Sequence, residues 1–290
     1  MWLFTQSIIN GILSGGVYAL IAVGITIIFG VMRLVNFASG AFFTLSMYLG
    51  YFCYLLTGWN CYQLIPLVSL LSIIVAYLTF RLTISPVLTK SRDATILVTV
   101  GLSFFLQNLV IVLFGGTALT LPSDISSDSI SIGGYMLGLP RTIAFVTALA
   151  LVLAISVMIN KTNFGRAMRA TSENPEVAEM LGIKSRRIYT IAWIIGIVMT
   201  SIGGLMLTPI YYVNNTVGSP FRTVSLMAVV LGGLGDIRGA FICGLLLGVV
   251  ESVLAAYFTA NIGLLGIFVV YLVVFLFKPQ GIFGRKERVG

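Results

Sequence analysis

Long apolar blocks constrain this chain more than any other feature of its sequence. Several of them reach the roughly 20 residues that an α-helix needs to cross the hydrocarbon core of a membrane. Of the 290 residues, 58% are hydrophobic and only 9% are charged, whereas a soluble domain carries about 25% charged residues. The chain therefore cannot hide its apolar side chains in one water-soluble core, and lipid is the solvent for most of it.

The pattern inside the blocks decides between the two structures that can span a bilayer. Backbone groups in lipid must be paired internally, which leaves helical bundles and closed barrels. Barrel strands show alternating polar and apolar residues over about 10 positions, and this alternation is absent. We therefore predict an all-α polytopic membrane protein in which residues 1–290 form one transmembrane domain.

We expect about eight transmembrane helices, at residues 8–29, 36–56, 63–84, 95–114, 141–160, 188–210, 240–258 and 262–278. The stretch around 225–240, with Asp236 and Arg238 at its tip, is broken by glycine and too short to cross, which indicates a half-helix or re-entrant element. Irregular backbone at membrane depth is tolerated only when it is buried in protein or lines a cavity, so Gly232, Gly233 and Gly235 are candidate pathway residues.

The distribution of basic residues predicts the orientation. Positive residues mark the cytoplasmic side, which explains the net charge of +8 better than nucleic-acid binding does. The segment 115–140, which holds Asp124 and Asp128 but no Lys or Arg, should lie outside, as should the N-terminus. The loop 161–187 and the C-terminal tail should lie inside, because they carry Lys161, Arg166, Arg169, Lys184, Arg186, Arg187, Lys278, Arg285, Lys286 and Arg288.

Residues that could support catalysis are scarce. The chain has no histidine, nine carboxylates and no P-loop, so we expect neither an enzyme nor an ATP site in this chain. Cys53, Cys61 and Cys243 lack metal-ligand spacing and are interpreted as small hydrophobic residues. We expect no metal site and no cofactor in this chain.

The loop 161–187 contains a segment that can form a short amphipathic helix. Ser172 is its expected N-cap, Pro175 fits its first turn and Gly182 can end it as the C′ residue. A helix resting on lipid would present basic rather than acidic residues, so a protein partner is the better interpretation. Its acidic residues are Glu173, Glu176 and Glu179, and its apolar contacts would be Val177, Met180, Leu181 and Ile183.

The stretch Glu176-Val-Ala-Glu-Met-Leu-Gly182 resembles the Glu-Ala-Ala-x3-Gly loop by which permeases of ABC importers dock into their ATPase subunits. Val177 replaces the first Ala, the Glu-to-Gly spacing is kept, and the Leu-Pro that follows in longer forms of the loop is missing. The residues expected to couple this chain to an ATPase are Glu173, Asn174, Pro175, Glu176, Ala178, Glu179, Met180, Leu181 and Gly182.

Four longer stretches, at 32–50, 95–115, 164–183 and 229–251, are similar in order to the LivH-type permeases of branched-chain amino acid ABC importers. The resemblance implies a bacterial plasma (inner) membrane protein that works with a LivM-like second permease and an extracytoplasmic binding protein. It also implies two cytoplasmic ATPase subunits that hold ATP and magnesium. The other expected partners are an amino-acid substrate and membrane lipid.

Polar residues inside the spans are costly and often functional. Gln107 and Asn108 either contact the substrate or hydrogen-bond between helices. Glu251 either pairs with a cation such as Arg238 or Arg33, or faces the pathway. Asn36, Ser39 and Gly40, at the start of the second span, have the same two interpretations.

Other functions remain open on sequence grounds. Urea and amide importers look similar in the same segments. An ion-coupled carrier would need more intramembrane acids than Glu251, a passive channel has only the glycine-broken element in its favour, and an intramembrane enzyme lacks a base. The carrier and the channel both leave the Glu176 to Gly182 loop unexplained.

Overall fold

The computed structural model describes residues 1–88, 90, 92–121 and 128–284 and is a helical bundle. Eight of its helices are long and apolar enough to cross a membrane, which confirms the predicted fold class. These are α1 (Trp2–Met32), α2 (Ser39–Thr57), α3 (Ile65–Thr79) with the π-helical turn η1 (Phe80–Ile84), α4 (Arg92–Phe114), α5 (Leu139–Lys161), α8 (Ser185–Leu207), α10 (Ile237–Tyr257) and α11 (Ala260–Phe277).

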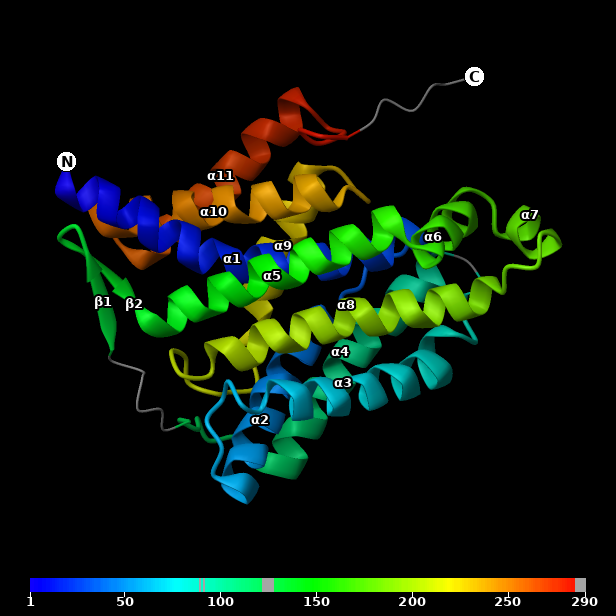
Figure 1. The fold of residues 1–290 in the computed structure, drawn as a ribbon, viewed down its shortest axis with the longest axis horizontal. Helices are drawn as coiled ribbons and strands as arrows, with labels where there is room; N and C mark the ends of the chain where they lie inside the picture. The colour runs from blue at the N-terminus through cyan, green and yellow to red at the C-terminus, as the bar shows by residue number, and fades with distance from the viewer. Residues whose placement is uncertain (89, 91, 122–127, 285–290) are drawn as a thin grey trace.

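The shorter elements lie between or beside these spans. They are a hairpin of β1 (Ser129–Ile132) and β2 (Tyr135–Gly138), the helices α6 (Asn163–Glu173) and α7 (Pro175–Met180), and the helix α9 (Gly218–Gly232). Figure 1 shows the N-terminus and the hairpin at one end of the bundle, and α6 and α7 at the other. We call these the hairpin end and the coupling end.

Helix α1 runs through the middle of the bundle and is mostly buried. It crosses α10 at very close range, because Gly11 and Gly15 of α1 face Gly244 and Gly248 of α10. A Cβ added to Gly248 would lie 2.4 Å from the Cα of Gly15, and one added to Gly244 would lie 2.5 Å from the Cα of Ala19. Small residues one turn apart let two helices approach to backbone contact, so these four glycines hold α1 and α10 together at close range.

The predicted short element is α9, which packs against α1, α2 and α10. The glycines 232–235, predicted as a break at membrane depth, lie at the coupling end, where Gly235 is beside Gly30 near the end of α1. Gly233 and Gly235 have φ values of 97° and 92°, which only glycine adopts readily. These glycines therefore form a tight turn at the end of the bundle.

The irregular backbone lies instead where α2 and α9 begin. A Cβ on Gly40 would lie 2.6 Å from the carbonyl oxygen of Gly218, so the first turns of the two helices touch. One turn later Phe43 stacks on Phe221 with ring centroids 4.9 Å apart, and Phe221 contacts Tyr18 at the middle of α1. Both helices thus start well inside the bundle, where surrounding protein must pair their backbone groups.

Candidate functional site

The predicted coupling helix is two helices that meet at Asn174. Ser172 is not the N-cap, because it lies in the last turn of α6. The cap of α7 is Asn174, whose Oδ1 accepts from the backbone N–H groups of Glu176 (3.0 Å) and Val177 (3.1 Å). Pro175 forces this break, because the residue before a proline is pushed out of helical conformation and Asn174 has φ −150° and ψ 106°.

The end of α7 is as predicted. Gly182 has a φ of 83°, its N–H donates to the carbonyl of Glu179 (2.9 Å), and the N–H of Ile183 donates to that of Ala178 (3.0 Å). This pair of bonds is a Schellman motif with glycine at C′. The hydroxyl of Ser185 donates to the carbonyl of Pro175 (3.2 Å) and so ties α7 to the start of α8.

The capped helix presents an open surface at the coupling end (Figure 1). Ala178 is buried, whereas Val177, Met180 and Leu181 are 50%, 85% and 75% exposed. Ile183 packs against the core and does not join them. The exposed residues of the predicted coupling set are Glu173, Asn174, Pro175, Glu176, Glu179, Met180, Leu181 and Gly182. A mixed apolar and acidic knob of this kind is a surface that another protein can hold.

The candidate pathway residues of α2 lie within the protein core. Asn36 and Ser39 are buried, and Asn36 Oδ1 accepts from the N–H of Ala38 (2.9 Å). Arg222 of α9 donates to the carbonyl of Phe37 (3.1 Å), and the N–H of Gly218 donates to Thr44 Oγ1 (3.1 Å). These bonds supply partners for the irregular backbone at the starts of α2 and α9.

Asn108 lies on the outward side of α4, and Gln107 next to it is partly buried. Asn108 is exposed and donates only to Phe104 of its own helix (2.8 Å), while Phe104 and Phe105 beside it are 63% and 61% exposed. The structure therefore does not bring these two amides together with Glu251 or with the glycine turn. An exposed amide in an apolar helix is unusual, since such groups normally face protein or water.

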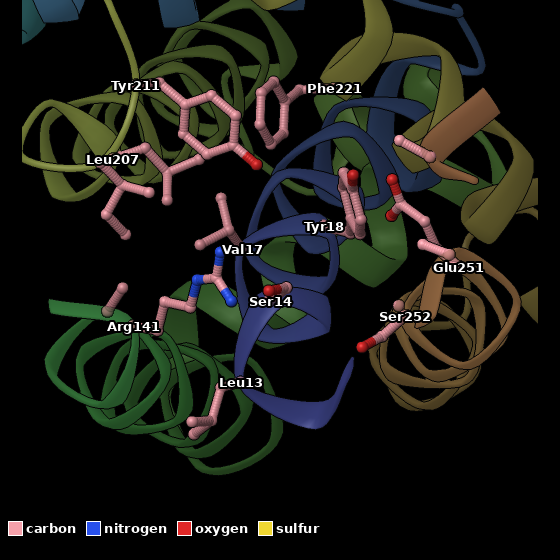
Figure 2. A pocket seen from close by; sticks show the side chains of 15 residues that line it. Leu13, Ser14, Val17, Tyr18, Arg141, Leu207, Tyr211, Phe221, Glu251 and Ser252 are labelled. Carbon is pink, nitrogen blue, oxygen red and sulfur yellow. The ribbon is translucent and has the colours of Figure 1, made fainter. Parts of the chain in front are cut away.

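Glu251 lines a cavity of about 300 Å³ at the hairpin end. Four residues of α1, at i, i+1, i+4 and i+5, form its floor: Leu13, Ser14, Val17 and Tyr18. Its walls come from the starts of α5 and α11, the end of α8 and the segment after it, and from α9 and α10. Figure 2 shows Arg141 on one side of this floor and Glu251 on the other.

Two tyrosines lie between the charged walls. The Tyr18 hydroxyl points toward the carboxylate of Glu251, and the Tyr211 hydroxyl points toward the middle of the cavity (Figure 2). Burial raises the pKa of Tyr211, while Arg141 lowers it and Glu251 raises it further. Both charges therefore act on one hydroxyl, although no ion pair joins Arg141 to Glu251. Glu251 also forms no ion pair with Arg33 or Arg238, the two cations that were considered for it.

Arg141 and both tyrosines were not predicted from the sequence. Arg141 carried a usable signal, because it begins a span on the side where the positive-inside rule expects few cations. Tyr18 and Tyr211 carried none, since their place at the cavity depends on how α1, α9 and α10 pack. The predicted positions Asp124, Arg285, Lys286 and Arg288 lie outside the described residues.

Comparison with known proteins identifies the family. The family described as "Branched-chain amino acid transport system / permease component" matches residues 7–277, which is nearly the whole bundle. This chain belongs to that family. Its members are permease subunits of transporters, so the chain is a multi-pass membrane permease and not a catalytic enzyme.

Curated relatives of this permease match it over almost their full lengths. It is 31% identical to the high-affinity branched-chain amino acid transport system permease protein LivH of Salmonella typhimurium, over 98% of this chain and 96% of that protein. LivH of Escherichia coli K12 is 30% identical over the same shares. BraD of Pseudomonas aeruginosa is 29% identical over 98% of this chain and 97% of that protein.

Proposed function

We propose that this permease translocates branched-chain amino acids into the cytoplasm as one subunit of an ATP-driven importer. The observation that carries the proposal is the exposed α7 knob at the end of a bundle whose family consists of such permeases. ATP and magnesium would be held by two ATPase subunits, and substrate would be delivered by a binding protein at the hairpin end.

The knob is suited to transmit motion. Asn174 caps its start, the Schellman bonds at Gly182 close its end, and Ser185 fastens it to α8. A short helix fixed at both ends moves as one body with the span that follows it. Closure of two ATPases on ATP would then push α8, and through it the bundle, toward the opposite opening.

A second, LivM-like permease would cover the outward face of α4. Asn108 and Gln107 would face this partner, which removes the cost of leaving an amide against lipid.

The orientation follows from the position of the ATPases, which would hold the coupling end in the cytoplasm. The hairpin end and the N-terminus would then lie outside, and the C-terminus inside. An impermeant maleimide added to intact cells should label Ser129→Cys and spare Val177→Cys.

The direct test is uptake of labelled leucine into vesicles that contain the full complex, with a pull-down of the ATPases from the same membranes. Glu176→Ala should lower both uptake and ATPase association. Asp93→Ala is the matched control, because Asp93 is also an exposed acid at the coupling end but belongs to α4. Leucine uptake that persists without ATPases would refute the importer assignment and favour an ion-coupled carrier.

Urea is the competing substrate class. Uptake of labelled urea in place of leucine by the wild-type complex would reassign the permease to urea or amide import, while leaving the coupling argument intact.

A further inference from the structure

The cavity at the hairpin end holds two opposite charges that do not neutralise each other directly. Arg141 and Glu251 are the only charged residues among the described residues that line it, and no ion pair joins them. An ionisable residue in a membrane span is costly unless it is paired or serves a ligand. The Tyr18 hydroxyl beside Glu251 offsets part of this cost, but the guanidinium of Arg141 faces the cavity without an acidic partner there (Figure 2).

Apart from the two charges, the lining combines apolar residues with four hydroxyl groups, those of Ser14, Tyr18, Tyr211 and Ser252. Ligand sites are typically apolar pockets of about 300–1,000 Å³ with a few well-placed polar groups, and this cavity of about 300 Å³ lies at the small end of that range. The floor between the charges presents the hydroxyl of Ser14 and the side chain of Val17. The remaining large apolar residues of the lining are Leu13, Leu207, Ile210 and Phe221.

The chemistry of each wall selects one end of a zwitterion. A guanidinium binds a carboxylate through two parallel N–H donors, which fixes its orientation as well as its charge. Arg141 also lies in the first turn of α5, where unpaired backbone N–H groups favour an anion. On the opposite wall, the carboxylate of Glu251 can accept from an ammonium group.

We propose that this cavity binds a hydrophobic amino acid as a zwitterion, with its carboxylate on Arg141, its ammonium on Glu251 and its side chain against the apolar lining. A simple cation would be repelled by Arg141 and a simple anion by Glu251, and neutral urea would leave both charges unpaired. The inference rests on the proposed function, because it gives the permease its own site for the substrate that the binding protein delivers.

Direct binding without the binding protein tests the site. The purified permease complex in lipid nanodiscs would be incubated with labelled leucine and competed with leucine, leucinamide, 4-methylpentanoate or urea. Leucinamide lacks the carboxylate and 4-methylpentanoate lacks the ammonium. Each should compete about tenfold or more weakly than leucine, since hydrogen bonds to charged groups are worth that much or more, and urea should not compete.

Charge-removing variants assign the two walls. Arg141→Gln should abolish the preference for leucine over leucinamide while keeping the preference over 4-methylpentanoate, and Glu251→Gln should do the reverse. These preferences are ratios of affinities, so they do not change if a variant lowers the fraction of folded protein. Arg81→Gln and Asp128→Asn are controls, because both residues are exposed and lie outside the cavity.

The inference is overturned if the wild-type complex does not bind leucine, or if both cavity variants keep the wild-type order of competitors. It is also overturned if each variant weakens all competitors equally, because such a loss indicates a structural role. Leucine uptake by the same complex with ATP and the binding protein separates the two proposals. Normal uptake with an unaltered order in the variants rejects the cavity site alone, whereas absent leucine uptake in the wild type rejects the proposed function.

Discussion

The crossing of α1 and α10 predicts a large difference between two chemically identical substitutions. In Gly244→Ala the new methyl group would lie 2.5 Å from the Cα, 2.7 Å from the N and 2.9 Å from the Cβ of Ala19. Carbon atoms in contact prefer about 3.5–4.0 Å, so the two helices must separate by about 1 Å. Overpacking of this kind costs about 1–3 kcal/mol, and the contact cannot relax by rotating a side chain because two of the three atoms are backbone.

Gly101→Ala is the matched control. Gly101 lies within α4, and a Cβ there meets nothing within 4 Å. Both substitutions gain the same helix propensity, about 1 kcal/mol, so the difference between the variants isolates the cost of packing. Thermal unfolding of the purified chain in detergent measures it: Gly101→Ala should melt at or above the wild-type temperature, and Gly244→Ala should melt several degrees below Gly101→Ala. Equal melting temperatures for the two variants would refute the close crossing.

Four further predictions follow from single residues. Asn174→Ala removes both cap bonds of α7 and should destabilise that helix by about 1 kcal/mol, seen as faster amide exchange in α7 with other spans unchanged. Gly182→Ala places a methyl group at a φ of 83° and should cost about 1 kcal/mol; unchanged exchange of the N–H of Ile183 would contradict this. Burial raises the pKa of the Cys61 thiol to about 12, so in a variant with Cys61 as its one cysteine, maleimide at pH 7 to 8 should react only after unfolding, and rapid labelling of the folded protein would contradict its burial. Asn108→Leu should weaken co-purification of the second permease while leaving the isolated chain as stable as wild type, and unchanged co-purification would place the partner on another face.

The sequence was sufficient for features that depend on local pattern. The spans follow from the length of the apolar blocks and from the absence of barrel-type alternation, which together leave helices as the structure that pairs the backbone inside lipid. Close helix packing by glycines of α1 and α10 was also predictable, since Gly11 and Gly15 are one helical turn apart and so are Gly244 and Gly248. It was not predictable that the glycines of α1 would face those of α10, because this depends on the three-dimensional path of the chain.

In the coupling segment, the restriction that a proline places on the residue before it outweighs the capping preference of a serine. Ser172 has the chemistry of an N-cap, but Asn174 precedes Pro175 and therefore cannot continue the helix. The proline restriction alone predicts the break between α6 and α7 and places the cap two residues after Ser172. The contact of Gly40 with Gly218, by contrast, joins residues far apart in sequence and had no local signal.

The cavity was only partly predictable. Glu251 was recognisable as a carboxylate deep in an apolar block, with an ion pair or a place on the pathway as its two interpretations, and the structure places it at the cavity. Its opposite charge, Arg141, comes from a different helix and the two tyrosines from two further segments. A site assembled from single residues of separate helices leaves no spacing pattern in the chain, so only the packed structure brings it together.

The central position of α1 has a consequence for how the protein is made. Helix α1 is synthesised before the other helices of the bundle, yet three of the helices that pack against it, α8, α9 and α10, follow only after residue 184. Until then α5 can pack on one side of α1, while the face of α1 that carries Gly11 and Gly15 and later meets α10 contacts lipid or the insertion machinery. The bundle must therefore close around α1 late in synthesis. A substitution in the contact between α1 and α10, such as one at Gly244, would act on this late assembly step rather than on membrane insertion.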